Sequence, residues 1–393
     1  MDFKLEFSGT GHRYTTEEVD VVQQVMQTAS PLTQGKYRDL FENKFAVYLG
    51  VEHAFTVNNA TNALEITGQL CLFQEGDEIL CPSHTFTASL YPFIKKGAKP
   101  VWVDIDPKTR VVSLENIKKA VTPKTKAIIA VHLYGYCIDD IERIEKFARE
   151  RNILLIEDVA QAMGTEVNGK KAGTFGDFAI FSFHSHKNMT TLGEGGMLVV
   201  KNKKYADIIP MLRHNGHCGF AFERENYWEP AMGNVDIPIL NGKYLMPNNY
   251  CLGEVECALG AKLLDRIDQM NTEKRQRAIE FIDRVSPHGL LQFHRVESKQ
   301  HNYHLLVAQV TGGKRDEFIR KMAYEKKIQC VVQYYPLNRY DFYKKLGFGK
   351  AHCPNADWFY DNMVSFPFHH WMSNEDFEYL TQSTINVIQE ING

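Results

Sequence analysis

Short β-rich runs alternate with helical runs between residues 54 and 215, and this alternation constrains the fold more than any other feature of the chain. Strands are expected at Ala54–Val57, Glu78–Cys81, Pro100–Asp104, Lys126–Leu133, Ile153–Glu157, Asp177–Phe183 and Met197–Val200. Helical periodicity fills several of the intervals, at Asn62–Phe73, Thr87–Lys96, Leu114–Val121 and Asp139–Arg151. Alternation of this kind predicts βαβ units and a mainly parallel sheet, and therefore an α/β fold.

The pattern changes beyond about residue 220. Residues 220–250 hold five prolines and glycines together with several aromatic residues, which predicts an ordered but irregular excursion. A long helical pattern follows at Leu252–Val285. The rest of the chain mixes strands and helices, expected at Tyr303–Val310, Arg315–Lys327, Gln329–Tyr335 and Asn374–Ile391. We therefore expect a large α/β domain over residues 1–250 and a small α+β domain over residues 251–393.

Composition narrows the possible partners and compartments. A net charge of −3 and a pI near 6.6 give no electrostatic reason to expect nucleic acid or an anionic membrane as a partner. No apolar run has the length of a membrane span, and the first residues lack the pattern of a secretory signal. The eight cysteines include no C-x-x-C pair, which is typical of reduced thiols. We expect a cytoplasmic protein.

One strand runs directly into a lysine and a glycine-rich turn, in the stretch FAIFSFHSHKNMTTLGEGGM. Ser182, Lys187 and the turn Gly193–Gly196 fall where this near-continuous apolar strand should end. In open α/β sheets, ligands bind at the carboxyl ends of the strands. A lysine buried there can lose its proton and attack a carbonyl, because burial disfavours the ammonium form. The alternative is a solvated surface lysine.

Three other segments end strands of the same expected sheet. Asp158 could pair with a cationic ring nitrogen, or it could cap a helix or stabilise a turn. Ala60 and Thr61 begin a helix whose free N–H groups would suit a phosphate, although Thr61 could equally be a simple cap. Phe86 could lie flat on an aromatic ring or belong to the core. His184 and His186 resemble half a metal site that no nearby carboxylate or cysteine completes, so no metal is expected.

Five motifs together resemble a known family: NATNAL, CPSHTFTAS, PVWVDID, IEDVAQAMG and FSFHSHKNMTTLGEGG. Their order and spacing are similar to those of the DegT/DnrJ/EryC1/StrS sugar aminotransferases, from about residue 12 to the C-terminus. The resemblance implies a pyridoxal-phosphate enzyme of fold type I, like aspartate aminotransferase. Such a fold has a mainly parallel seven-stranded sheet and a smaller C-terminal α+β domain.

The resemblance also implies roles for individual residues. Lys187 would hold pyridoxal 5'-phosphate covalently and act as the catalytic base and acid. Asp158 would pair with the pyridine nitrogen, and Gln161 would approach the phenolic oxygen. The remaining cofactor contacts would come from Ala60, Thr61 and Ser182 at the phosphate, Phe86 on the ring, and Asn249 from the partner subunit of a homodimer with shared active sites.

The same resemblance implies transfer of an amino group from L-glutamate to a nucleotide-linked keto sugar, a 4-keto or 3-keto deoxysugar. The product would serve the synthesis of a surface polysaccharide or glycoconjugate. Pyridoxamine 5'-phosphate would be the intermediate form of the cofactor. Two departures, Cys251 in place of arginine and Asn338 in place of histidine, keep a small phosphorylated or carbocyclic ketone open as the acceptor. Some relatives carry histidine at the lysine position and dehydrate their substrate. Here Lys187 stands five residues after Ser182, and this register argues for a transaminase. A non-catalytic cofactor-bound sensor is the alternative outside enzymes, and the presence of Lys187 with Asp158 argues against it.

Overall fold

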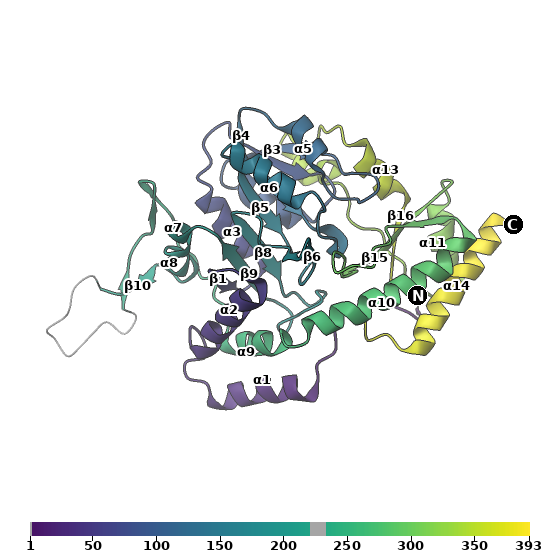
Figure 1. The fold of residues 1–393 in the computed structure, drawn as a ribbon, viewed down its shortest axis with the longest axis horizontal. Coiled ribbons are helices and arrows are strands. Elements are labelled where there is room, and N and C mark those ends of the chain that lie inside the picture. Colours follow the sequence, from purple (N-terminus) through teal and green to yellow (C-terminus); the bar gives the residue numbers. More distant parts are fainter. Residues whose placement is uncertain (1, 221–232) are drawn as a thin grey trace.

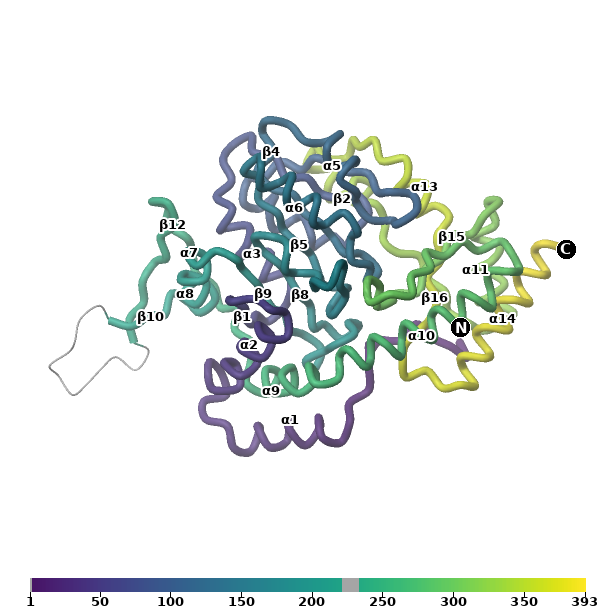
Figure 2. Tube along the Cα trace, in the orientation of Figure 1, coloured from purple at the N-terminus to yellow at the C-terminus, as the bar shows by residue number. Residues whose placement is uncertain are grey.

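The computed structural model describes residues 2–220 and 233–393 (Figure 1). A large α/β body carries the first part of the chain, and a smaller body holds both termini. The long helix α10 (Ile267–Val285) runs from one body to the other (Figures 1 and 2). Residues 221–232 of the expected excursion lie outside the described residues. No helix in the described ranges is long and apolar enough to cross a membrane.

A seven-stranded sheet in the order β1-β9-β8-β5-β4-β2-β3 forms the centre of the large body, which confirms the expected α/β class. Strands β2, β3, β4, β5 and β8 pair in parallel, whereas β9 pairs antiparallel with both β8 and β1. The strands are β1 (Ala54–Val57), β2 (Glu78–Pro82), β3 (Lys99–Val103), β4 (Thr125–Val131), β5 (Leu154–Asp158), β8 (Phe178–Ser182) and β9 (Gly196–Val200). Since β1 and β8 are both antiparallel to β9, their carboxyl ends share one edge of the sheet with those of β2 and β5.

Helices cover this sheet and extend it. The large body contains α1 (Thr16–Thr28), α2 (Lys36–Leu49), α3 (Ala60–Leu70), α4 (Tyr91–Ile94), α5 (Leu114–Ala120), α6 (Ile141–Glu150), α7 (Lys203–Ala206), α8 (Ile209–Arg213) and α9 (Glu254–Leu263). Short strand pairs lie outside the sheet, formed by β6 (Glu166–Val167) with β7 (Lys170–Lys171), β10 (His217–Cys218) with β11 (Asn234–Val235), and β12 (Ile239–Leu240) with β13 (Lys243–Tyr244).

The smaller body is an antiparallel three-stranded sheet packed against helices. It contains β14 (Leu291–Phe293), β15 (Leu306–Val310), β16 (Met363–Phe366), α11 (Arg315–Tyr324) and α14 (Asn374–Asn392), and it joins the large body through α12 (Asp341–Lys345) and α13 (Pro354–Asn362). Its hydrophobic cluster is separate from that of the large sheet, and α10 contributes side chains to both clusters. The boundary at residues 250/251 stays a prediction.

Two expected elements are wrong in detail. The helical pattern Leu252–Val285 forms two helices, because the backbone leaves the helical conformation at Arg266 (φ −126°, ψ 4°). The guanidinium of Arg266 donates to Glu18 and to the carbonyl of Arg13. The expected strand Gln329–Tyr335 makes a single bridge, Val331 to Ser365, and its later residues turn away to line a cavity.

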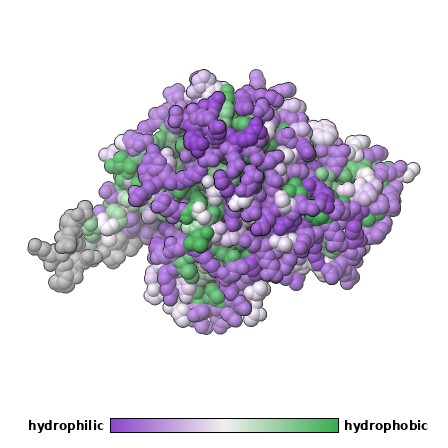
Figure 3. All heavy atoms as spheres, in the orientation of Figure 1, coloured by the Kyte–Doolittle hydropathy of each residue, from purple (hydrophilic) through white to green (hydrophobic). Residues whose placement is uncertain are grey.

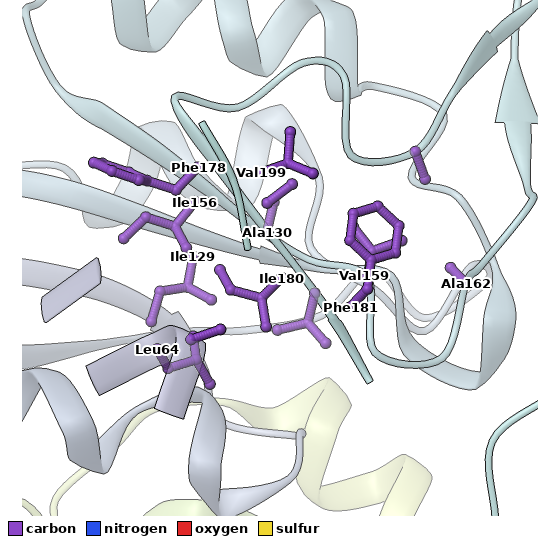
Figure 4. Close-up of a cluster of buried hydrophobic side chains, with 14 of the residues drawn as sticks. Leu64, Ile129, Ala130, Ile156, Val159, Ala162, Phe178, Ile180, Phe181 and Val199 are labelled. Atoms are coloured by element: carbon purple, nitrogen blue, oxygen red, sulfur yellow. The ribbon is translucent and has the colours of Figure 1, made fainter. Parts of the chain in front are cut away.

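Continuous apolar runs explain the buried centre of the sheet. Ile129, Ile156, Phe178 and Ile180 come from neighbouring strands and pack together, with Leu64 of α3 against them (Figure 4). All of these side chains are at most 2% exposed, as expected for parallel strands that are covered on both faces.

The buried carboxylate of Glu157 holds the carboxyl end of β5 in place. Glu157 accepts hydrogen bonds from the N–H groups of Gly173 (2.8 Å), Phe175 (2.7 Å) and Gly176 (2.6 Å), and from His132 Nε2 (3.0 Å). His132 Nδ1 accepts the N–H of Ile138, so this imidazole is neutral and donates through Nε2. Burial raises the pKa of Glu157, but the hydrogen bonds outweigh burial and leave the pKa below its ordinary value.

Glu157→Gln is therefore expected to destabilise the protein by about 1–3 kcal/mol. The amide NH₂ of glutamine would face N–H groups that now donate to a carboxylate oxygen, and these buried donors would lose their acceptor. Urea unfolding at neutral pH measures this loss, with the exposed Glu150→Gln as a control within about 0.5 kcal/mol of wild type. Since the folded pKa is lowered, the contribution of Glu157 is present above pH 4.5 and is lost as the pH falls further. Equal stability of the two variants would contradict this assignment.

Candidate active site

A cavity of about 630 Å³ lies at the carboxyl edge of the large sheet and reaches the smaller body. The ends of β1, β5 and β8 contribute to it, as does the segment after β2. Its wall includes Ala60, Thr61, Phe86, Asp158, Gln161, Ser182 and Lys187, which are all of the expected site residues except Asn249. Residues that are up to 127 positions apart in the sequence therefore meet in one place, as sheet topology predicts.

Lys187 lies half-buried in the cavity wall. Desolvation lowers its pKa from 10.5 to about 8, although the nearby Asp158 carboxylate raises it. The N-terminal segment supports this lysine closely: Gly11 donates its N–H to Ser185 O (2.8 Å), and a Cβ on Gly11 would lie 1.8 Å from Lys187 O. Only glycine allows that approach. The backbone of Lys187 therefore packs against Gly11 of the N-terminal segment, and its amine is partly deprotonated near neutral pH.

Asp158 is buried at the end of β5, and both of its carboxylate oxygens accept hydrogen bonds. Oδ2 accepts from the Ser89 hydroxyl (2.7 Å), and Oδ1 accepts from the N–H of Ala160 (3.1 Å). The Ser89 hydroxyl in turn lies 3.1 Å from that of Thr85. These contacts hold the carboxylate in one orientation at the cavity wall, where it can pair with a cation.

The start of α3 offers unpaired donors to the cavity. Asn59 caps the helix by accepting the N–H of Asn62 (2.9 Å), which leaves the first two N–H groups, those of Ala60 and Thr61, without a protein partner among the described residues. The hydroxyl of Thr61 lies beside them, and that of Ser182 lines the same cavity. Free N–H groups at a helix start, together with two hydroxyls, are the donor set that binds a phosphate.

Gln161 connects the large sheet to the segment that follows Val331. Its Oε1 accepts the N–H of Tyr134 (2.7 Å), and its Nε2 donates to the hydroxyl of Tyr334 (2.9 Å). Burial raises the pKa of Tyr334 to about 12, so this phenol stays protonated. Phe86 faces Tyr334 edge-on at 6.0 Å and is 54% exposed, which excludes the core alternative for Phe86.

Asn249 lies apart from the cavity of its own chain. It is exposed, bridges His214 through the backbone, and accepts the N–H of Cys251 at 3.4 Å. Cys251 and Asn338, the two departures from the family pattern, do not line this cavity either. Within a single chain, neither departure alters the wall of this cavity.

Sequence reasoning missed several residues of the wall. Ser89 stands in the quoted motif CPSHTFTAS, three residues after Phe86, and Tyr334 stands in the segment QYYPLNRY, so both were within reach of motif comparison. His304 stands just before an apolar strand, and nothing in its local pattern points to a site. Glu194, whose carboxylate lies 3.9 Å from His184 Nε2, belongs to the glycine-rich turn.

The chemistry of this donor set fits pyridoxal 5'-phosphate. The helix start and the two hydroxyls suit its phosphate, the half-buried amine suits its aldehyde, and the buried carboxylate suits its pyridine nitrogen. One cavity thus holds a partner for each functional group of this molecule. Bound there, the cofactor supplies an electron sink for chemistry at a carbon that bears nitrogen.

Comparison with known proteins gives the same assignment. The family model for the DegT/DnrJ/EryC1/StrS aminotransferase family matches residues 12–384. GDP-perosamine synthase of Escherichia coli O157:H7 is 33% identical over 371 residues, which cover 94% of this chain and 95% of that protein. A putative sugar aminotransferase of Streptococcus pneumoniae, Spr1654, solved in its PMP form, has a TM-score of 0.83 at 26% identity, over 98% of this chain and 100% of that one. Helicobacter pylori PseC, an aminotransferase of pseudaminic acid biosynthesis, has a TM-score of 0.87 at 24% identity, over 98% and 100% of the two chains, and supports the fold.

The fold and the site define a pyridoxal-phosphate-dependent aminotransferase of fold type I. The chain belongs to the DegT/DnrJ/EryC1/StrS aminotransferase family.

Proposed function

We propose that this enzyme transfers an amino group from L-glutamate to a nucleotide-linked keto sugar, in the synthesis of a surface polysaccharide or glycoconjugate. The observation that carries the proposal is the half-buried Lys187 amine, with its pKa near 8, in one cavity with Asp158 and the phosphate-type donors of α3. The sugar acceptor is supported by GDP-perosamine synthase, a relative over nearly the whole chain. The eight free cysteines support a reducing compartment, the cytoplasm.

Within this proposal, each residue has a defined task. Lys187 holds the cofactor and, when its amine is free, moves a proton at the reacting carbon, because a pKa near the working pH suits both removal and return of a proton. Asp158 keeps the pyridine nitrogen protonated, since its fixed carboxylate stabilises a cation. Thr61 and Ser182 hold the phosphate, Gln161 stands beside the phenolic oxygen, and Phe86 covers the ring.

The acceptor is tested by loading the enzyme with amine from glutamate and then adding candidate ketones. Return of the pyridoxal absorption identifies the acceptor. The panel contains GDP-, UDP- and dTDP-linked keto sugars and, as the alternative class, small keto-phosphates and carbocyclic ketones. Recovery with the small ketones alone would replace the nucleotide-sugar proposal. Failure of glutamate to load the enzyme would refute the donor.

We further propose a homodimer in which Asn249 completes the partner's site. An arm at residues 234–246 extends from the large body and carries exposed apolar side chains: Val235, Ile237, Ile239, Tyr244 and Met246. Further exposed apolar residues lie on α1 and α2, where the mainly hydrophilic surface becomes more hydrophobic in the lower part of Figure 3. A second copy of the chain is the natural cover for such a surface, because a dimer would bury the arm and bring the exposed Asn249 to a neighbouring cavity.

Complementation tests the shared site. Asn249→Asp is expected to cost about 1.5–3 kcal/mol of cofactor binding, because it replaces an amide donor to a phosphate with a carboxylate. Mixing inactive Lys187→Ala with Asn249→Asp should then restore about a quarter of wild-type activity, since half of the dimers keep one complete site.

The control is a mixture of Lys187→Ala with Asp158→Asn. Both residues line the cavity of the same chain, so no mixed dimer has a complete site and no activity should return. An active monomer in sedimentation, or equal recovery in the two mixtures, would refute the sharing of Asn249.

A further inference from the structure

Four buried polar side chains form a hydrogen-bonded chain behind the cavity. Asn188 follows Lys187 directly, Asn271 and Lys274 come from α10, and His304 stands just before β15. Each is at most 7% exposed. Of the four, only His304 lines the cavity.

The orientation of the two amides follows from one backbone carbonyl. Asn271 Nδ2 donates to Met163 O (2.9 Å), which can only accept, so the Oδ1 of Asn271 faces Asn188. Asn188 must then donate through Nδ2 to that oxygen (3.0 Å), which leaves its own Oδ1 as an acceptor. Lys274 Nζ, a donor, points to the same Oδ1 at 3.4 Å and to His304 O at 2.8 Å.

This orientation determines the tautomer of His304. Its Nδ1 lies 3.3 Å from Asn188 Oδ1 and must carry the ring proton. Burial, with smaller contributions from Lys187 and Lys274, holds the pKa of His304 well below its usual range, so the imidazole is neutral and Nε2 has a free lone pair. No described residue bonds to Nε2, and this nitrogen is not enclosed by protein.

We propose that the Asn271–Asn188 pair locks His304 as a hydrogen-bond acceptor that binds a hydroxyl group of the sugar acceptor beside Lys187. A neutral imidazole with a bare nitrogen cannot pair with a carboxylate or a phosphate, which excludes the acidic groups of glutamate and the nucleotide phosphates as its ligands. Hydroxyl groups are the donors that a keto sugar brings to this part of the cavity. The assignment of the ligand rests on the proposed function, whereas the proton on Nδ1 rests on the hydrogen-bond geometry and the bare Nε2 on the lowered pKa of the buried ring.

The tautomer is tested by long-range ¹H–¹⁵N correlation of the imidazoles in the ¹⁵N-labelled holoenzyme at neutral pH. The signals of His304 are those that His304→Phe removes. Nδ1 should be protonated and Nε2 bare, and Asn271→Leu, which frees the Asn188 amide, should change this pattern. A wild-type Nε2–H or a doubly protonated ring would overturn the lock.

The ligand is tested by separate half-reactions, with glutamate as donor and a GDP-linked 4-keto-6-deoxyhexose as the acceptor probe. His304→Phe should slow the acceptor half-reaction at limiting probe about tenfold more than the donor half-reaction, because only the acceptor loses a hydrogen bond. His294→Phe makes the same change outside the cavity and should resemble wild type in both.

Equal losses in the two half-reactions would overturn the hydroxyl assignment. If wild-type enzyme reacts with no nucleotide-linked keto sugar at all, the proposed function fails and the hydroxyl assignment falls with it. The lock on His304 is then judged by the imidazole spectrum alone.

Discussion

Lys187→Ala is expected to reduce turnover by at least about 10³-fold while the protein still folds and binds the cofactor. The variant loses both the covalent attachment and the group that moves the proton, but it keeps the phosphate donors of α3 and the carboxylate of Asp158. Borohydride should fix the cofactor to Lys187 in wild type, and peptide mapping locates the adduct. Lys201→Ala, which removes an exposed lysine after β9, is the control and should remain active.

The pH dependence of the same amine gives an independent measurement. With a pKa near 8, the neutral fraction of Lys187 rises roughly tenfold between pH 7 and 9, whereas an ordinary lysine would gain roughly a hundredfold over that range. The rate at which the apoenzyme captures pyridoxal phosphate should therefore level off above pH 8. Asp158→Asn should move this midpoint to lower pH, because the carboxylate raises the lysine pKa. An adduct on another lysine, or a rate that keeps rising to pH 10, would refute the assignment.

Most of the site could be predicted because its residues stand at the ends of strands that the sequence marks clearly. Asp158 and Ser182 end runs of apolar residues, and parallel topology brings such ends to one edge. Local patterns therefore predict where these strands end. The roles of Lys187, Asp158 and Gln161 come from the resemblance to the family, because the local pattern alone leaves Lys187 and Asp158 with structural alternatives.

The errors arise where distant contacts override the local pattern. At the helix break, the side chain of Arg266 bonds to Glu18 and Arg13, about 250 residues away, and no helical periodicity encodes that pairing. The segment after Val331 has the β-propensity of a strand, but it pairs with the sheet only at Val331, and Tyr334 lines the cavity, where its hydroxyl accepts from Gln161. His304 lines the cavity wall and bonds through Nδ1 to Asn188, which lies 116 residues away in the sequence.

Asp158→Asn is expected to slow the half-reaction with glutamate by about 10²–10³-fold, because a neutral amide no longer stabilises a protonated pyridine nitrogen and the electron sink weakens. The fold should survive this change. The amide oxygen can keep the bond from Ala160 N–H, and the Ser89 hydroxyl can rotate to accept from the amide nitrogen.

Stopped-flow absorption with glutamate alone measures this loss before any acceptor is added, so the result does not depend on the identity of the sugar. Asp104→Asn is the matched control: this carboxylate also follows a strand, β3, but it accepts the N–H groups of Asn355 and Ala356 at the start of α13 instead of facing the cavity. Its stability should fall while its half-reaction stays near wild type. Wild-type kinetics in Asp158→Asn would refute a role for this carboxylate in the reaction and would show that Asp158, with its bond from Ser89, serves only the structure.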